Sequence, residues 1–142
     1  MVTCVQILAL ILACLAVTHA GPPKKSSLGY EMGDLNDIQG VGIKGKVIFA
    51  DKSTILLKNF FYGYPAPDMF FWADHNKFTD SGLKIPSRSG LDKLDSDYNG
   101  SDVTLKLPAG KSLKDYNIFG MFCKTYAKEF SVIKYEPKDL IF

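Results

Sequence analysis

Cysteine thiols are the most reactive side chains in this chain, and there are three of them, at Cys4, Cys14 and Cys123. Cys4 and Cys14 lie in an N-terminal apolar stretch that is typical of a removable signal, so we expect Cys123 to be the single thiol of the mature protein. A single thiol cannot form an internal disulfide. If it is exposed, it is available for redox exchange or for pairing with another molecule; if it is buried, it is inert.

The residues around Cys123 favour a buried position. It ends the apolar run 118–123, and in a strand its side chain shares a face with Met121 and Phe119. Apolar surroundings disfavour the thiolate that nucleophilic or redox chemistry requires, and a buried cysteine behaves as a small apolar residue. Lys124 would point to the opposite face, away from the thiol. From these residues alone, we interpret Cys123 as part of the core.

Hydrolytic and metal chemistry have little support. After residue 20 the chain has one histidine, His75, in a polar segment that directly follows an aromatic run. No serine lies in the elbow motif that would complete a Ser-His-Asp arrangement. One histidine and one cysteine are too few ligands for a zinc site. We therefore expect a protein that is not an enzyme and that needs no cofactor or resident metal.

Residues 95–100 match the first half of a calcium-binding loop. Asp95, Asp97 and Asn99 place oxygen ligands at alternate positions, and Gly100 permits a sharp turn. The position that needs a bidentate glutamate is instead Lys106, so a solvated turn is the simpler interpretation. Asn99 also begins an Asn-Gly-Ser sequon, which predicts N-glycosylation in a secreted protein. A glycan and a calcium ion would compete for this side chain.

Aromatic residues flank a turn rich in proline and glycine between residues 60 and 72. Tyr62 and Tyr64, at this turn, are candidates for stacking against a sugar or another matrix polymer, because flat rings bring a large contact area at a small entropic cost. The alternative is a core strand and its corner. We expect core positions for Phe60, Phe70 and Trp72, and both interpretations stay open for Tyr64.

The N-terminus has the composition of a secretion signal. An apolar run over residues 4–17 ends in the small residue Ala20, and this run is short for a membrane span. The 122 residues that follow (142 minus 20) suffice for one domain with its own core. The predicted organisation is a signal peptide over 1–20, a flexible leader over 21–28, a β domain over 29–137 and a C-terminal tail over 138–142.

The charge balance argues against a nucleic-acid partner. The chain has 17 basic and 15 acidic residues, a net charge of +2, and the two signs are interspersed along the sequence. Nucleic-acid binding usually requires lysine and arginine clustered on one face. We therefore expect a secreted protein with no nucleic-acid partner and no membrane span.

Short runs of β-branched and aromatic residues dominate the chain after residue 40. Each run is bounded by Gly, Pro, Asn or Asp, which is typical of strands and turns; the runs lie at 47–49, 55–61, 69–72, 103–107, 118–123 and 130–135. The turn-like residues 50–53 predict a hairpin between the first two. No segment keeps a helical period for three turns. We predict an all-β fold, an antiparallel sandwich or barrel of short strands with little helix.

A series of motifs in fixed order resembles the DM13 domain, a module of animal and bacterial extracellular proteins. The series begins with Gly-Tyr-Glu-Met-Gly-Asp-Leu at 29–35, continues through Pro67-Asp68 and its aromatic strand and Leu-Pro at 107–108, and ends at Cys123. Three departures accompany it. The family's histidine is absent from 41–45, its acid is absent from 62–64, and Phe122 replaces its tryptophan before the cysteine.

The resemblance implies two functional classes. The first is a binding domain in an extracellular matrix, cuticle or shell-like setting, with a matrix protein or polysaccharide as partner. The alternative is an extracellular redox or electron-transfer module that uses Cys123, because multidomain relatives often carry a cytochrome-type DOMON domain beside this module. This sequence shows no such domain, so the electron partner would have to be another molecule. A third interpretation is a tyrosine-bearing, cross-linkable matrix component.

Overall fold

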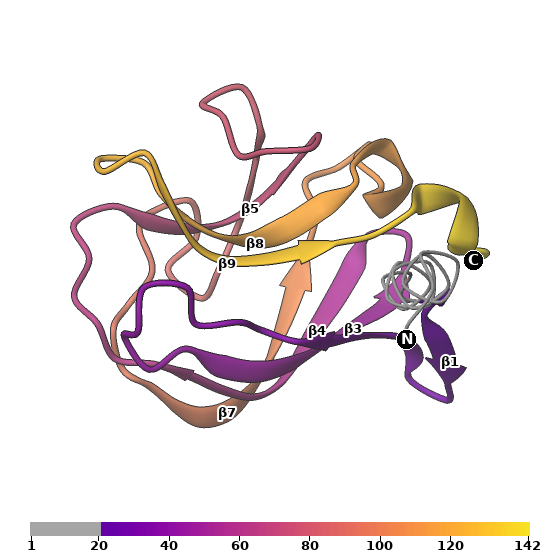
Figure 1. The fold of residues 1–142 in the computed structure, drawn as a ribbon, viewed down its shortest axis with the longest axis horizontal. Helices are drawn as coiled ribbons and strands as arrows, with labels where there is room; N and C mark the ends of the chain where they lie inside the picture. Colours follow the sequence, from indigo (N-terminus) through magenta and orange to yellow (C-terminus); the bar gives the residue numbers. More distant parts are fainter. Residues whose placement is uncertain (1–20) are drawn as a thin grey trace, which may run out of the picture.

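A computed structural model of the chain describes residues 21–142, so the predicted signal peptide over 1–20 lies outside the described residues. The described part contains nine β-strands and two short 3-10 helices, η1 (Leu113–Asp115) and η2 (Pro137–Asp139). Neither helix is long and apolar enough to cross a bilayer. The strands form two layers that face each other (Figure 1).

Both layers are antiparallel sheets. The first has five strands in the order β1 (Lys24–Ser26), β2 (Gly29–Asp34), β3 (Lys44–Asp51), β4 (Thr54–Tyr62) and β7 (Tyr98–Lys106). The second has four strands in the order β6 (Leu83–Ile85), β5 (Met69–Asp74), β8 (Ile118–Cys123) and β9 (Lys128–Lys134). The predicted all-β fold is therefore confirmed, and of the two architectures considered it is the sandwich.

The strongest apolar patterns correspond to observed strands. The predicted hairpin is β3–β4, and its turn is held by the Asp51 carboxylate, which accepts from the Ser53 N–H at 2.8 Å and the Thr54 hydroxyl at 2.9 Å. The run 118–123 is β8 without a change of bounds. The sequence reading missed β1, β2 and β6, because these short strands lack a run of β-branched or aromatic residues.

Both predicted end segments, the leader and the tail, contact the domain. The leader contains β1, which pairs with β2, so residues 24–26 are part of the sheet. The tail is packed against the domain: Leu140 is fully buried, and the Tyr30 hydroxyl bonds both backbone groups of Ile141 at 3.0 and 3.1 Å. Apolar contact and backbone pairing over both terminal segments outweigh their polar composition.

The core lies between the two sheets, and a smaller apolar cluster covers the outer face of the four-stranded sheet. Phe60 belongs to the central core, as predicted. Phe70 and Trp72 are also buried, but they belong to the outer cluster, which consists of Phe70, Trp72, Phe78, Ile118 and Phe122. Because side chains alternate along a strand, Phe71 faces the central core instead. Strand β5 is thus buried on both faces.

Candidate functional site

Cys123 ends β8 with its side chain in the central core, and its exposed fraction is 0%. Phe119 and Met121 belong to the same cluster, as the alternation of side chains predicted. Met69 of β5 and Lys128 of β9 lie opposite Cys123 in the two ladders. The thiol is therefore closed off from solvent by both neighbouring strands and by the facing sheet.

Backbone hydrogen bonds close the end of the sheet where Cys123 lies. The Lys124 N–H donates to the Asp68 carbonyl at 3.0 Å, and the Leu94 N–H donates to the Met69 carbonyl at 2.8 Å. The Lys124 ammonium lies over the Trp72 ring on the outer face, 5.5 Å from the ring centroid. As predicted, this cation is directed away from the thiol.

Tyr62 is the polar side chain that accompanies Cys123 in the core. Its side chain is 1% exposed, so of the two interpretations the structure favours the core position over stacking on a ligand. Its hydroxyl has no hydrogen-bond partner within residues 21–142, and the nearby Ala66 N–H donates to the Tyr64 carbonyl at 2.9 Å. Burial, with a smaller effect from the nearby Cys123 thiol, raises the pKa of Tyr62 to about 12.

Tyr64 is directed outward. Its ring is 39% exposed, and its centroid lies 6.0 Å from that of Phe130, which is buried, with 30° between the two ring planes. Phe130 thus supports one side of an exposed tyrosine. Of the two tyrosines considered for stacking, Tyr64 has the accessibility that a surface contact requires.

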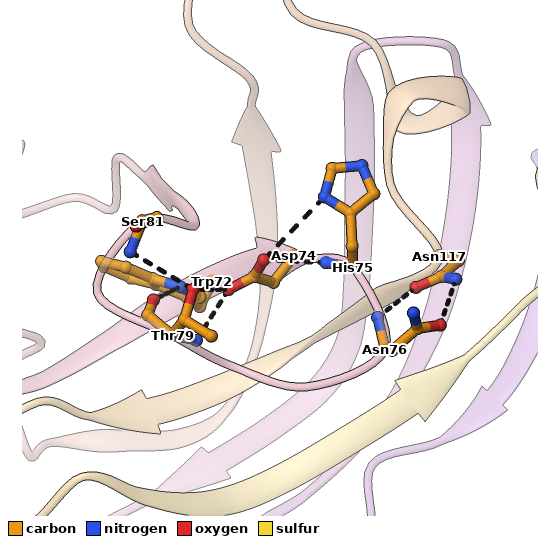
Figure 2. A network of polar contacts seen from close by, with 7 residues as sticks. All are labelled: Trp72, Asp74, His75, Asn76, Thr79, Ser81 and Asn117. Carbon is orange, nitrogen blue, oxygen red and sulfur yellow. Dashed lines mark hydrogen bonds and ion pairs between the residues drawn. The ribbon is translucent and has the colours of Figure 1, made fainter.

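The other end of β5 carries a buried polar network (Figure 2). Asp74 is 6% exposed, and its carboxylate accepts from the His75 N–H at 2.8 Å, the Thr79 N–H at 2.7 Å and the Thr79 hydroxyl at 2.9 Å. The Trp72 indole donates to the Thr79 carbonyl at 3.0 Å. Three donors satisfy this carboxylate, so its role is to anchor the segment after β5.

Gly82 is packed against the same network. A Cβ at this position would lie 2.1 Å from the Trp72 indole nitrogen and 2.5 Å from an Asp74 carboxylate oxygen. Any larger residue would therefore displace one of the two side chains. This close contact explains why a glycine is required at position 82.

His75 lies at the surface of this network. Its side chain is 65% exposed, its Nδ1 lies 3.9 Å from an Asp74 oxygen, and its ring lies 5.4 Å from that of Tyr116. Cys123 is at the opposite end of the β5–β8 ladder, five residues or roughly 16 Å along the strand. The two residues whose types suggest a Cys-His pair are thus kept apart.

Residues 95–100, which match the first half of a calcium-binding loop, interact with an arginine. Arg88 forms ion pairs with Asp95, at 2.8 Å, and with Asp97, and this contact lowers the pKa of Asp95. A calcium ion would have to displace the guanidinium, and residues 21–142 hold no group of three or more metal-ligating side chains. Asn99 is exposed, as a glycan acceptor must be, but it lies in β7 opposite Phe61.

Sequence reasoning missed two residues that organise these sites, Asp74 and Arg88. Asp74 carried one usable signal, since an acid that directly ends an apolar strand and precedes a polar segment is suited to bind backbone N–H groups. Arg88 carried none, because its two carboxylate partners are seven and nine residues away in an irregular segment.

Residues 21–142 thus form a two-sheet sandwich with one cysteine buried between the sheets. The chain belongs to the DM13 family: the family described as "Electron transfer DM13" matches residues 35–135. The resemblance to DM13 that the motif series indicated is therefore confirmed.

Two curated relatives match over most of this chain. It is 30% identical over 129 residues to Protein Skeletor, isoforms B/C, of Drosophila melanogaster. This match covers 89% of this chain and 16% of that protein. The match to Protein Skeletor, isoforms D/E, has the same identity and covers 8% of that protein. The chain thus spans less than a fifth of the length of either relative. No solved structure matches it.

Proposed function

We propose that this chain is a secreted DM13 domain that binds a matrix protein or polysaccharide in an extracellular matrix, cuticle or shell-like setting, with Cys123 as a core residue. The burial of Cys123 carries this proposal. Thiol–disulfide exchange requires a thiolate that can reach another sulfur, whereas this side chain is 0% exposed. Function is then a property of the surface.

Tyr64 is the contact residue that we assign to this binding. It is the exposed member of the aromatic turn, and the buried Phe130 restricts its ring. A restrained aromatic ring loses little conformational entropy when a flat sugar face stacks on it. Tyr126, which is 51% exposed, provides a matched control on another part of the surface.

Retention on insoluble chitin and on extracted matrix tests this assignment. We expect Tyr64→Ala to weaken retention about tenfold, as the loss of one aromatic contact residue does. Tyr126→Ala should bind like the unmodified protein. Equal losses for the two variants, or no retention of the unmodified protein on either material, would contradict the assignment.

Electron transfer is the second candidate, favoured by the family description and by the position of Tyr62 beside Cys123. In this scheme the thiol gives one electron to an oxidised one-electron carrier, such as a haem domain of another protein, and its proton to water. Because Cys123 is buried, its proton cannot easily reach water. We therefore rank electron transfer below matrix binding as the function of this domain. A titration with a one-electron oxidant, read by loss of the free thiol, distinguishes Cys123 from a Cys123→Ala control.

Secretion and glycosylation belong to the same proposal. Expression in a eukaryotic secretory host should deliver the chain to the medium, with its N-terminus at residue 21. Asn99 is exposed, so removal of N-glycans should lower the mass of the secreted protein, and Asn99→Gln should abolish that change. Retention inside the cell would contradict the proposal.

A further inference from the structure

The four edges of the two sheets differ in how they are protected. An open strand edge presents unpaired N–H and C=O groups that can pair with another chain. Strand β9 is covered, since the Ile38 N–H donates to the Phe130 carbonyl at 3.1 Å and the Asn36 side chain accepts from the Val132 N–H at 2.8 Å. Strands β1 and β6 have three residues each.

Strand β7 is the exception. It has nine residues, it lies at the outer edge of the five-stranded sheet, and it pairs on one side with β4 (Figure 1). No backbone group of residues 99–105 makes a hydrogen bond on the other side within the described part of the chain. This long free edge is the place where the sandwich can accept another strand.

A groove of about 610 Å³ runs along this edge, between β7 and residues 86–88. Arg88 stacks on the Tyr98 ring at one end, with its guanidinium carbon 3.9 Å from the ring centroid. The Tyr98 side chain also lines the groove; its hydroxyl is buried beside Ser87 and has no hydrogen-bond partner within residues 21–142. A free strand edge and an unpartnered buried hydroxyl thus meet in one groove.

The charges on β7 are complementary to a second copy of the same strand. Asp102, Thr104 and Lys106 alternate on the outer face and are all exposed. In an antiparallel pair centred on Thr104, Asp102 of each copy lies opposite Lys106 of the other. We propose that β7 pairs with β7 of a second copy about a two-fold axis at Thr104, joining two five-stranded sheets into one.

The ends of the strand agree with this register. Val103 falls opposite Leu105 of the second copy on the inner face, so apolar residues meet apolar residues. Gly100 falls opposite Pro108, and the ladder stops there because proline has no N–H to donate. Asn99 lies beyond the paired stretch, which leaves room for a glycan. The inference depends neither on polysaccharide binding nor on the role of Cys123.

Cysteine cross-linking tests the register directly. In the proposed pair the two copies of position 104 are opposite each other, within the reach of a disulfide, whereas the two copies of position 101 are offset by six residues, or roughly 20 Å. Mild oxidation of the purified full protein should convert Thr104→Cys to a covalent dimer and leave Ser101→Cys, which is also at an exposed position, monomeric. Cys123 does not compete, because it is buried.

Charge reversal tests the same pair without a cross-link. Asp102→Lys places like charges opposite Lys106 twice in the dimer, and we expect the dimer dissociation constant to rise at least about tenfold in sedimentation measurements. The double variant Asp102→Lys with Lys106→Asp should restore it. Thermal unfolding of each variant separates this effect from loss of the Lys58–Asp102 ion pair within the monomer.

Three results would overturn the proposal. The first is a protein that stays monomeric at all concentrations and cross-links no faster with Thr104→Cys than with Ser101→Cys. The second is preferential cross-linking through position 101, which requires a different register. The third is protection of the β7 amides from hydrogen exchange only when a different protein is added, which would identify a foreign strand as the occupant.

Discussion

The two ends of the β5–β8 ladder are both buried, but they differ in whether their polar atoms are hydrogen-bonded. At the Cys123 end, a thiol and the Tyr62 hydroxyl lie among apolar side chains, and that hydroxyl has no partner in the described part of the chain. At the Asp74 end, one carboxylate accepts three hydrogen bonds. The residue types that suggest chemistry are thus divided between an apolar site and a satisfied structural network.

Residue types alone therefore do not establish a catalytic or redox function at either end of this ladder. A buried carboxylate beside a histidine resembles part of a catalytic arrangement, but its lone pairs are committed to the segment that it anchors. A buried thiol beside a tyrosine resembles a redox site, but it is closed to solvent. We therefore predict that loss of the Asp74 carboxylate costs more stability than loss of the Cys123 thiol.

The largest effect is expected for Asp74→Ala. This change leaves two partly buried backbone N–H groups and the Thr79 hydroxyl without their acceptor, and we expect a loss of about 3 kcal/mol in the free energy of unfolding. Chemical denaturation measures it. Asp80→Ala, at an exposed position in the same segment, is the control and should change stability little. Similar losses for both variants would show that the network is not the anchor.

A smaller loss is expected at the apolar end for Cys123→Ser. The change keeps the size of the side chain but buries a hydroxyl among apolar groups, which should cost about 2 kcal/mol. Cys123→Ala should cost about 1 kcal/mol, because it removes one sulfur atom and adds no polar group. If Cys123→Ser proved as stable as the unmodified protein in denaturant titrations, the thiol would have a polar or solvent-filled environment.

Tyr62→Phe should change the alkaline stability profile. The folded-state pKa of about 12 lies above the value of 10.0 for an unburied tyrosine, so the stabilisation is complete below pH 10 and is lost as the pH rises to 12. The phenylalanine variant should lose roughly 2 kcal/mol less over this window. At neutral pH it should be more stable than the unmodified protein, since the change removes a buried hydroxyl that has no partner within residues 21–142.

Parallel unfolding curves at pH 7 and between pH 10 and pH 12 provide this comparison. Tyr135, whose pKa is also raised by burial, contributes equally to both proteins and therefore cancels in the difference. Identical profiles for the two proteins above pH 10 would mean that the Tyr62 hydroxyl reaches solvent.

The smallest effect is expected for His75→Ala. The imidazole is 65% exposed and its contact with Asp74 is 3.9 Å long, so its removal should change stability by less than about 0.5 kcal/mol. The backbone bond from the His75 N–H remains. A loss of stability comparable to that of Asp74→Ala would show that the His75 imidazole is part of the buried network.

The sequence predicts the parts of the fold that depend on local apolar patterns. Strand β8 and the β3–β4 hairpin were predicted from such runs. Strand β1 was not predicted, because Lys24–Ser26 has no pattern of apolar residues. It forms a strand by pairing with the edge of β2. Leu140 was missed for a similar reason, as the pocket that buries it is formed by residues distant in sequence.

The site was predicted in part. The alternation that puts Phe60 inside also puts Tyr62 inside, so Tyr62 should have followed Phe60 into the core. The hydrogen bonds between Asn76 and Asn117 join residues 41 positions apart, and no local sequence pattern predicts them. The free β7 edge likewise depends on which strands become neighbours.

The state of the Cys123 thiol tests the central claim most directly. Intact mass is measured on the non-reduced protein after treatment with a thiol-alkylating reagent, once in native buffer and once in denaturant. We predict no adduct on Cys123 in native buffer and one adduct after unfolding. Rapid alkylation in native buffer, or recovery of the protein as a disulfide or mixed adduct through Cys123, would contradict it and favour the redox alternative.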